Sequence, residues 1–365
     1  MARILTFLGK GGVGRTTIAI ATAKRFASQG QRVLFATQDP GAAVGILLGA
    51  TLTTEPTPYE PNLAVMQLQA AALLEQNWDE LKRLEAQYLR TPFLKEVYGQ
   101  ELGVLPGMDT ALVLNALREY DASQQYDVIV YDGSGDQTTL RMFAIPDVLS
   151  WYVRRFRQLF VNSDLGKTVM PLLQPIAMAV LNVGWTGDIF EQPATQQMNS
   201  LLDQGREAVA DPHRVAAYLV TTVDDAAIAT AKYLWGAAQQ AGLTVGGVIV
   251  NQASTAESVS DQFAPLPVTW VPSQPVNDWQ SLVDALPNFD QAAQQPRPLA
   301  INVAERKVSL FLPGCDRKQV KLTQYGPELT IEAGDHRRNI FLPPELQGRT
   351  VTGAKFQDGF LIISF

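Results

Sequence analysis

The chain has 365 residues, enough for one large domain plus a small one or for two medium ones, and its 46% hydrophobic and 18% charged residues exclude an intrinsically disordered chain. The formal net charge of −7 and the lack of any basic stripe argue against a general nucleic-acid-binding protein, so no nucleic-acid partner is expected. The single cysteine, Cys315, excludes an intrachain disulfide and a cysteine-based zinc site within one chain, and no zinc is expected.

The first expected elements are an apolar strand at Ile4–Leu8, a glycine-rich stretch GKGGVGRTT at Gly9–Thr17, and a helix over Thr16–Gln29. This order predicts a phosphate-binding loop, because glycines let consecutive backbone N–H groups point into one concavity and the helix N-terminus adds positive potential. The stretch fits the pattern G-x-x-x-x-G-K-[ST], except that Arg15 stands where lysine is expected. The loop begins nine residues from Met1, which predicts a cytoplasmic protein without a signal peptide.

The next part of the chain, to about residue 290, alternates short apolar runs with helix-compatible stretches, and this predicts a mostly parallel sheet covered by helices. The further strands are expected at Val33–Thr37, Leu63–Leu68, Val128–Asp132, Val215–Thr221, Val245–Asn251 and Val268–Val271. The further helices are expected at Gln69–Leu89, Thr110–Tyr120 and Ala226–Ala241.

An apolar helical insertion is expected at Val148–Val209, where the alternation of strands and helices stops. Its apolar faces must pack on each other, on a partner subunit or on a ligand, and the sequence leaves these alternatives open.

The last part of the chain differs in character. Pro287–Pro298 is rich in proline and glutamine, and we place a linker at 291–299 between a domain at 1–290 and a second domain at 300–365. Closely spaced short strands and turns then predict a small antiparallel all-β sandwich. Its strands are expected at Val308–Phe311, Val320–Thr323, Leu329–Glu332, Asn339–Leu342, Val351–Phe356 and Phe360–Ile363.

Several residues could carry chemistry around the glycine loop. The Thr16 hydroxyl and the Asp132 carboxylate, which ends an apolar strand, are predicted to hold Mg²⁺. Arg15 is predicted to reach the β- and γ-phosphate oxygens, and Asp39, which follows the second strand, to hold or activate the attacking water. The stretch 133–141 is interpreted as a flexible segment that senses the γ-phosphate. The predicted nucleotide-binding residues are Gly9, Gly11, Gly12, Val13, Gly14, Arg15, Thr16, Thr17 and, for a purine edge, Asn251.

Five motifs in order resemble one family. GKGGVGRTT resembles the deviant Walker A motif of the P-loop ATPases that include nitrogenase iron proteins, septum-site proteins, arsenite-pump ATPases and the tail-anchored-protein-targeting ATPases of the Get pathway. TQDPGAA and DGSGDQTTLR resemble switch I and switch II of the arsenite-pump and targeting ATPases, and LPGMDTAL and VNQ are similar to two further motifs. The resemblance implies ATP and Mg²⁺ as cofactors, a homodimer in which Lys10 reaches the partner's phosphates, and catalytic roles for Lys10, Arg15 and Asp39.

The resemblance also gives the insertion a function, because in the targeting ATPases such a helical insertion forms a groove for a client's transmembrane helix. It implies hydrophobic or transmembrane segments as partners, with membranes contacted only indirectly. The residues assigned to client binding are Trp151, Phe156, Leu159, Phe160, Met170, Leu173, Ile176, Met198 and Leu202.

The C-terminal part resembles an α-crystallin domain of small heat-shock proteins, with an A-x-x-x-n-G-v-L box at Ala354, Gly359 and Leu361. A role in shielding the client or docking on the ATPase body is expected from analogy alone.

Three departures from the family separate the candidate functions. Arg15 replaces the Walker lysine, the CxxC zinc clasp of the eukaryotic targeting ATPases is missing, and Ala42 and Ala43 stand where a histidine is usual. We expect an ATP-hydrolysing homodimeric chaperone or targeting factor. The alternative is a nucleotide-gated holder with little hydrolysis, because Arg15 alters the transfer geometry. An anion pump, which needs several thiols, and a membrane-surface ATPase, which needs an amphipathic tail, are disfavoured.

Overall fold

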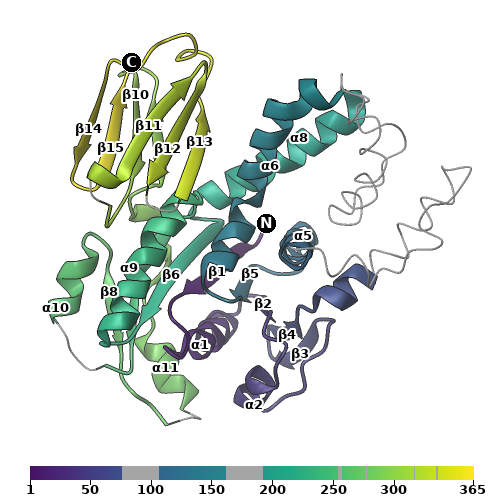
Figure 1. The fold of residues 1–365 in the computed structure, drawn as a ribbon. Helices are drawn as coiled ribbons and strands as arrows, with labels where there is room; N and C mark the ends of the chain where they lie inside the picture. Colours follow the sequence, from purple (N-terminus) through teal and green to yellow (C-terminus); the bar gives the residue numbers. More distant parts are fainter. Residues whose placement is uncertain (76–106, 162–191, 254–256, 276–277, 316, 334–335) are drawn as a thin grey trace, which may run out of the picture. The chain divides into compact units, whose positions relative to one another are not determined.

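The computed structural model describes residues 1–75, 107–161, 192–253, 257–275, 278–315, 317–333 and 336–365 (Figure 1). The chain divides into two compact units. The first comprises Met1–Ala2, Phe26–Ile129 and Met142–Glu207, and the second comprises Arg3–Arg25, Val130–Arg141 and Ala208–Phe365.

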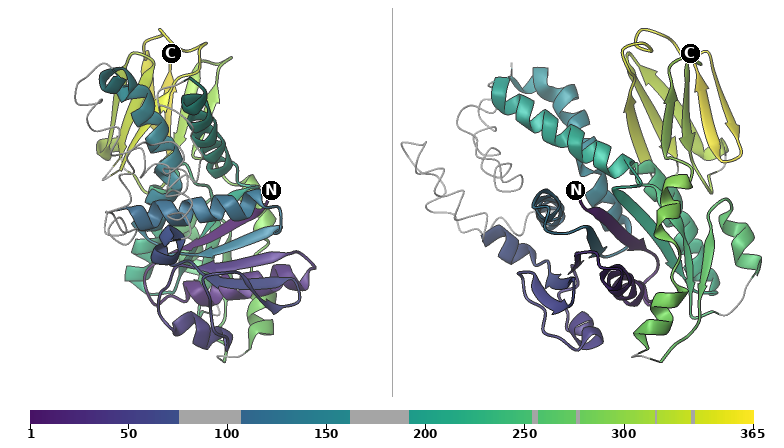
Figure 2. Two further views of the ribbon diagram at one scale, coloured as in Figure 1. Left: turned by 90° about the vertical axis from the view of Figure 1, so that its right-hand side faces the viewer. Right: turned by 180° about the vertical axis from the view of Figure 1, so that it is seen from behind.

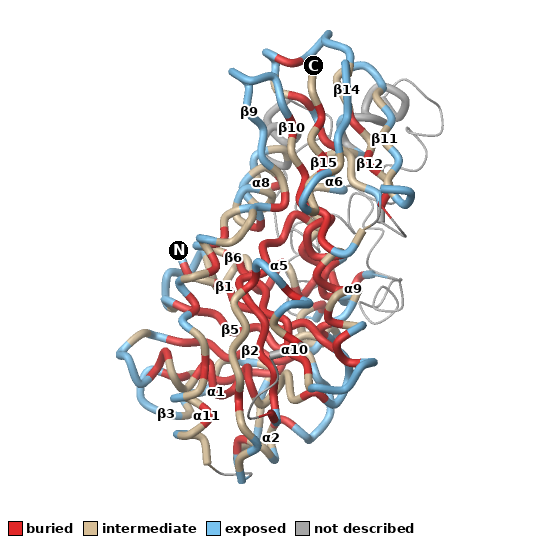
Figure 3. The backbone as a smooth tube through the Cα atoms, turned by 90° about the vertical axis from the view of Figure 1, so that its left-hand side faces the viewer, coloured by how far each residue is buried: buried red, intermediate tan, exposed pale blue. Residues whose placement is uncertain are grey.

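The larger sheet confirms the predicted mostly parallel α/β architecture. Its described strands are hydrogen-bonded in the order β3-β4-β2-β5-β1-β6-β7-β8. In the second unit β1, β6, β7 and β8 pair in parallel, and in the first unit β2 pairs in parallel with β4. Every residue of β6 and β7 is buried, as expected for strands covered on both faces. Figure 3 colours the backbone by burial, with buried residues in red. The strands are β1 Arg3–Leu8, β2 Val33–Thr37, β3 Thr57–Glu60, β4 Leu63–Gln67, β5 Val128–Asp132, β6 Val215–Thr221, β7 Val245–Asn251 and β8 Val268–Val271.

The helices expected at Thr16–Gln29, Thr110–Tyr120 and Ala226–Ala241 are present with nearly the same bounds, and the described short helices were not predicted. The helix expected at Gln69–Leu89 is described only for residues 70–75, and the rest of that range lies outside the described residues. The longer described helices are α1 Arg15–Ser28, α5 Met108–Ala122, α6 Gln137–Val161, α8 Gln192–Ala210 and α9 Asp225–Gln240. The shorter ones are α2 Ala43–Leu48, α10 Glu257–Ser260, α11 Trp279–Ala285 and the 3-10 turns η1 Asp261–Phe263, η2 Phe289–Gln294 and η3 Arg317–Gln319.

Helix α6 corrects the interpretation of 133–141 as a flexible stretch. It begins at Gln137 and continues through Pro146 into the expected insertion. Helices α6 and α8 lie side by side (Figures 1 and 2), and a Cβ atom on Gly205 of α8 would come within 3.0 Å of the Pro146 ring. The lack of a side chain at Gly205 therefore lets the two helices approach closely at the proline.

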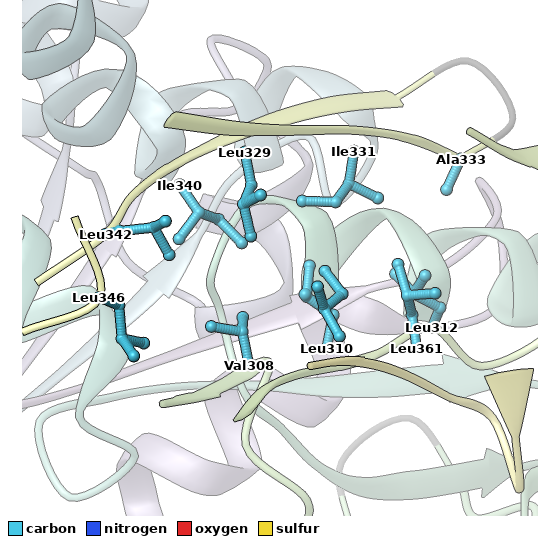
Figure 4. Packing of buried hydrophobic residues seen from close by; sticks show 11 residues of the cluster. Val308, Leu310, Leu312, Leu329, Ile331, Ala333, Ile340, Leu342, Leu346 and Leu361 are labelled. Atoms are coloured by element: carbon cyan, nitrogen blue, oxygen red, sulfur yellow. The ribbon is translucent and has the colours of Figure 1, made fainter. Parts of the chain in front are cut away.

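The C-terminal part is a two-layer antiparallel sandwich, as predicted. One sheet has the order β14-β15-β10-β9 and the other the order β11-β12-β13. Inward-facing apolar side chains of both layers meet in one core, with Leu329 and Ile331 opposite Val308 and Leu310 (Figure 4). The strands are β9 Leu299–Asn302, β10 Lys307–Phe311, β11 Val320–Tyr325, β12 Glu328–Ala333, β13 His336–Phe341, β14 Gly353–Gln357 and β15 Phe360–Ser364.

The sandwich contacts helix α9 within the second unit. The Trp235 ring meets the Phe311 ring edge to face at 5.7 Å, and both side chains are buried. Arg338 of β13 donates a hydrogen bond from Nη1 to the carbonyl oxygen of Gln239, 3.0 Å away, in the last turn of the helix. A cation at this end of a helix also complements the helix dipole.

The segment in front of the sandwich has more structure than the linker expected at 291–299. Residues 289–294 form the 3-10 turn η2, and the Phe289 side chain is buried. The Tyr218 hydroxyl donates to the Phe289 carbonyl oxygen at 2.8 Å, and the two rings meet edge to face. Arg25 donates to the carbonyl oxygens of Leu286 and Pro287. These contacts hold the segment against α1 and β6 of the second unit.

Among the described residues, no helix is both long enough and apolar enough to cross a bilayer.

An ion pair at the start of two strands predicts a pH dependence of stability. Arg32 donates from Nη2 to Asp127 Oδ1 at 2.6 Å and from its backbone N–H to Oδ2, which lowers the pKa of Asp127 to about 2. Because the folded-state pKa lies below the unfolded one, the contribution is present above about pH 4 and is lost as the pH falls toward 2.

The variant Asp127→Asn should therefore have a melting temperature lower by roughly 1–2 °C at pH 7, a small effect because the pair is solvent-exposed. Calorimetry of both proteins between pH 7 and pH 2.5 should show this difference shrinking below pH 4. A difference that does not change with pH would contradict the role of the carboxylate charge.

Candidate nucleotide-binding site

The glycine loop leaves strand β1 and enters helix α1 with the backbone that a phosphate-binding loop needs. Gly12 and Gly14 have φ angles of 86° and 90°, a region that residues with side chains rarely adopt. A Cβ on Gly11 or Gly12 would meet no atom within 4 Å, whereas one on Gly14 would overlap the side-chain amide of Asn251. The loop is thus closed on the Asn251 side and open at Gly11 and Gly12.

The predicted magnesium ligands lie together. The Thr16 hydroxyl, in the first turn of α1, donates to Asp132 Oδ1 at the end of β5 over 3.3 Å. Asp132 is only 4% exposed. A hydroxyl oxygen beside a buried carboxylate, at the mouth of a phosphate loop, is an oxygen donor set that suits Mg²⁺. Among the residues that the structure describes, no three histidine, cysteine or acidic side chains converge on a metal position.

Arg15 contacts two backbone carbonyl groups. Its guanidinium donates from Nη1 to the carbonyl oxygens of Ser134 and Gly133, the latter 3.4 Å away. Burial lowers the pKa of Arg15, and the neighbouring Asp132 and Asp136 carboxylates act in the opposite direction. The predicted contact of Arg15 with phosphate oxygens stays a prediction.

The segment that Arg15 contacts, residues 133–136, is an ordered turn, and we call it the 133–136 loop. Asp136 accepts hydrogen bonds from the Ser134 hydroxyl at 2.6 Å and from the Thr138 backbone N–H at 2.8 Å. Burial opposes the charge on Asp136, but these hydrogen bonds and the Arg15 charge outweigh it and lower its pKa. Sequence reasoning missed Asp136, although an Asp placed directly before a helix is an N-cap signal.

Lys10, at the tip of the glycine loop, is half exposed and lies near a carboxylate of its own chain. Its Nζ is 3.5 Å from Asp224 Oδ1. Asp224 is the N-cap of α9 and accepts from the Ala227 backbone N–H at 2.9 Å. The reach of Lys10 into a partner subunit remains a prediction, and Asp224 is an addition that the Asp-Asp step before a helical run could have signalled.

Asn251 lies at the end of β7 next to the glycine loop. Its side-chain amide donates from Nδ2 to the Val13 carbonyl oxygen at 2.9 Å, and the residue is buried. The structure thus gives Asn251 a role in bracing the loop, and its contact with a purine stays a prediction.

Asp39 belongs to the first unit, where it closes a turn after β2. Its Oδ1 accepts from the Gly41 backbone N–H at 2.8 Å, and Gln67 donates to its carbonyl oxygen at 2.6 Å. The residue as a whole is exposed. Its role with the attacking water remains a prediction.

The residues assigned to client binding are covered only in part. Trp151 is half-buried on α6, and Leu202 on α8 is buried. The exposed apolar side chains of the described part of α6 are Val148, Leu149 and Tyr152, which the sequence analysis did not assign. Phe156, Leu159, Phe160 and Met198 lie in described helices, but their side chains are outside the description, and Met170, Leu173 and Ile176 lie wholly outside the described residues.

Comparison with known protein families finds a matching model for each of the two parts of the chain. The family model described as an anion-transporting ATPase matches residues 2–267, and a model described as an HSP20-like domain found in these ATPases matches residues 304–365. These ranges contain the glycine loop with its Thr16–Asp132 pair and most of the β-sandwich, respectively.

Individual relatives support the same assignment. The chain is 26% identical to a putative arsenical pump-driving ATPase of Chlorobaculum tepidum over all of this chain and 96% of that protein. It is 21% identical to putative arsenical pump-driving ATPase 1 of Aquifex aeolicus over 99% of each chain. An ATPase ASNA1 homolog of Cryptosporidium parvum is 33% identical over 39% of this chain and 37% of its own length. With the family model covering more than half of its length, the chain belongs to the anion-transporting ATPase family and carries that family's HSP20-like domain.

Proposed function

We propose that this protein is an ATP-hydrolysing homodimeric chaperone that shields hydrophobic segments of client proteins. The observation that carries the nucleotide part is the buried Asp132 carboxylate beside Thr16 at the mouth of the glycine loop. When bound, Mg²⁺ would neutralise negative charge on the reacting phosphate of the triphosphate. Thr16 and Asp132 would hold the metal, the amides of the loop would bind the phosphates, and Asp39 would orient the attacking water.

The client part of the proposal is supported by helix α6. Val148, Leu149 and Tyr152 are 47%, 39% and 50% exposed, although each is a large apolar or aromatic side chain. They recur at a spacing that places them on one side of a helix. Covering such a surface with an apolar segment gains on the order of 25 cal/mol per Å² before ordering costs.

A nucleotide-gated holder that hydrolyses little ATP is the second candidate, and one observation favours it. Arg15, in place of the usual lysine, donates to the carbonyl oxygens of the 133–136 loop. An anion pump is less well supported, because this chain has a single cysteine, Cys315, for binding a metalloid.

The client proposal is tested with a probe of defined chemistry, a fluorescent peptide of about 20 apolar residues with lysine ends, long enough to mimic a membrane-spanning helix. Fluorescence anisotropy of the full chain should show binding that changes at least about fivefold when Mg²⁺ and ATP are added. The variant Leu149→Ser combined with Tyr152→Ser should weaken binding by about tenfold or more, through lost apolar contact area.

The matched control is Ile46→Ser, because Ile46 is 78% exposed on α2 and belongs to no assigned surface. Light scattering on the same samples measures the dimer. Equal peptide affinity for the α6 variant and wild type, or a monomer under all nucleotide conditions, would rule out the chaperone model as stated.

A further inference from the structure

The Arg15 side chain ties the phosphate loop to the 133–136 loop. Arg15 is the first residue of α1, and it donates from Nη1 to the Ser134 and Gly133 carbonyl oxygens across 118 residues of chain. A second link is the Gly9 backbone N–H, which donates to the Gly135 carbonyl oxygen at 2.9 Å. Both links join the glycine-rich stretch Gly9–Thr17 to the same short turn.

Gly135 makes room for the guanidinium. Its φ angle is 64°, and a Cβ at this position would overlap Arg15 Nη1 and come within 2.7 Å of the Phe7 carbonyl oxygen. Thr139 also holds the turn, because its buried hydroxyl accepts from the Gly135 backbone N–H at 3.0 Å. The turn is therefore fixed by Thr139 at a backbone N–H and by Arg15 at two carbonyl oxygens.

Two classes of acceptor compete for the Arg15 guanidinium. The first consists of the two neutral carbonyl oxygens that it contacts here, with the Asp132 and Asp136 carboxylates nearby. The second consists of the phosphate oxygens that the residue at this position of the pattern binds. A phosphate oxygen carries ionic charge and a carbonyl oxygen only a partial one, so the charged guanidinium should favour the phosphate.

We propose that Arg15 is a positioning residue for the 133–136 loop, and that a bound β-phosphate draws the guanidinium away and releases this loop. The proposal rests on the proposed nucleotide site and adds a regulation to it, because phosphate occupancy and the Arg15 anchor exclude each other. Both contacts that make up the anchor come from one atom of the guanidinium, Nη1.

Hydrogen exchange of the full chain, followed by mass spectrometry on peptides that cover residues 133–140, tests the anchor. Without nucleotide, Arg15→Met should exchange about tenfold faster there than wild type, the effect of losing one or two hydrogen bonds. The matched control is Lys10→Met, which removes the same charge from the same loop but whose partner is Asp224. Its exchange at 133–140 should equal that of wild type.

The second arm adds Mg²⁺ and ADP, chosen because ADP lacks the γ-phosphate that could itself contact the 133–136 loop. Saturating ADP should bring wild-type exchange to the level of Arg15→Met and should leave Arg15→Met unchanged. If Arg15→Met folds poorly, Gly135→Ala disturbs the same contact from the 133–136 loop and should by itself exchange about tenfold faster than wild type at 133–140.

Each outcome decides one part of the proposal. Equal exchange of Arg15→Met and wild type without nucleotide would show that Arg15 is no anchor. Wild-type exchange that saturating ADP leaves unchanged or slows would overturn the competition. A failure of ADP to bind, measured separately by titration calorimetry, would refute the proposed nucleotide site, while the comparison of the variants without nucleotide would still decide whether Arg15 anchors the loop.

Discussion

An Asp39→Asn variant is expected to lose nearly all Mg²⁺-dependent ATP hydrolysis while still binding ADP as wild type does. Asparagine has the same shape, and its Oδ1 can still accept from the Gly41 backbone N–H, so the turn after β2 should persist. Only the negative charge that would orient and deprotonate water is removed. Loss of a general base typically lowers kcat by roughly 10²–10⁴-fold.

Steady-state phosphate release measures this effect, with ADP titration calorimetry as the test of binding. The matched control is Asp261→Asn, an exposed aspartate of η1 in the second unit, which should keep wild-type turnover. Two further variants, Lys10→Ala and Arg15→Lys, separate the candidate functions. Lys10→Ala should also abolish turnover if Lys10 completes the site of a partner subunit.

The opposite pattern would support the holder. If wild type binds ATP but turns over no faster than Asp39→Asn, and Arg15→Lys gains activity, then Arg15 has replaced catalysis by gating. In that case the hypothesis of an ATP-hydrolysing enzyme is wrong, and the peptide-binding experiment alone decides the client-binding proposal.

A Gly9→Ala variant is expected to weaken both the fold and nucleotide binding. Gly9 is buried where β1 enters the glycine loop, and its added Cβ would overlap the Val220 carbonyl oxygen of β6 and approach Val13 Cγ2 at 3.3 Å. The carbonyl is backbone, so it cannot rotate away as a side chain could, and the two strands must separate. Overpacking of this kind lowers the free energy of unfolding by about 1–3 kcal/mol or more.

Thermal unfolding of the full chain should show the lower stability, and ADP affinity should fall by about tenfold or more because the loop shifts with the strand end. Gly11→Ala is the matched control in the same loop, since its Cβ would meet no atom within 4 Å. Similar behaviour of the two variants would mean that the close approach of Gly9 to β6 does not limit the site.

Local sequence patterns were enough to predict most strands of the larger sheet. Strands such as Val215–Thr221 and Val245–Asn251 are mostly apolar, and the structure contains them with the expected bounds. Strand β3, TPYE, escaped prediction because it is a mostly exposed antiparallel edge strand with a proline and no apolar alternation. Strand β9 escaped because its few residues follow a proline-rich segment.

The contacts of the candidate site could be predicted only where a motif states them. The Thr16–Asp132 proximity followed from the combined phosphate-loop and strand-end pattern. The Arg15 contact with Ser134 joins residues 119 apart, and no local rule says which of several acceptors a long side chain will choose. Lys10 beside Asp224 is a similar case, because the family resemblance pointed the lysine toward another subunit.

Helix α9 attaches the C-terminal sandwich to the rest of the second unit. The helix has 16 residues, a rod of about 24 Å. Asp224, beside Lys10, caps its first turn, and Trp235 and Gln239 near its last turn contact Phe311 and Arg338 of the sandwich. A sandwich held in this way is not a freely swinging appendage. For it to swing away from the helix, the Trp235 ring would have to be bared to water and the Gln239 carbonyl would have to give up its charged donor.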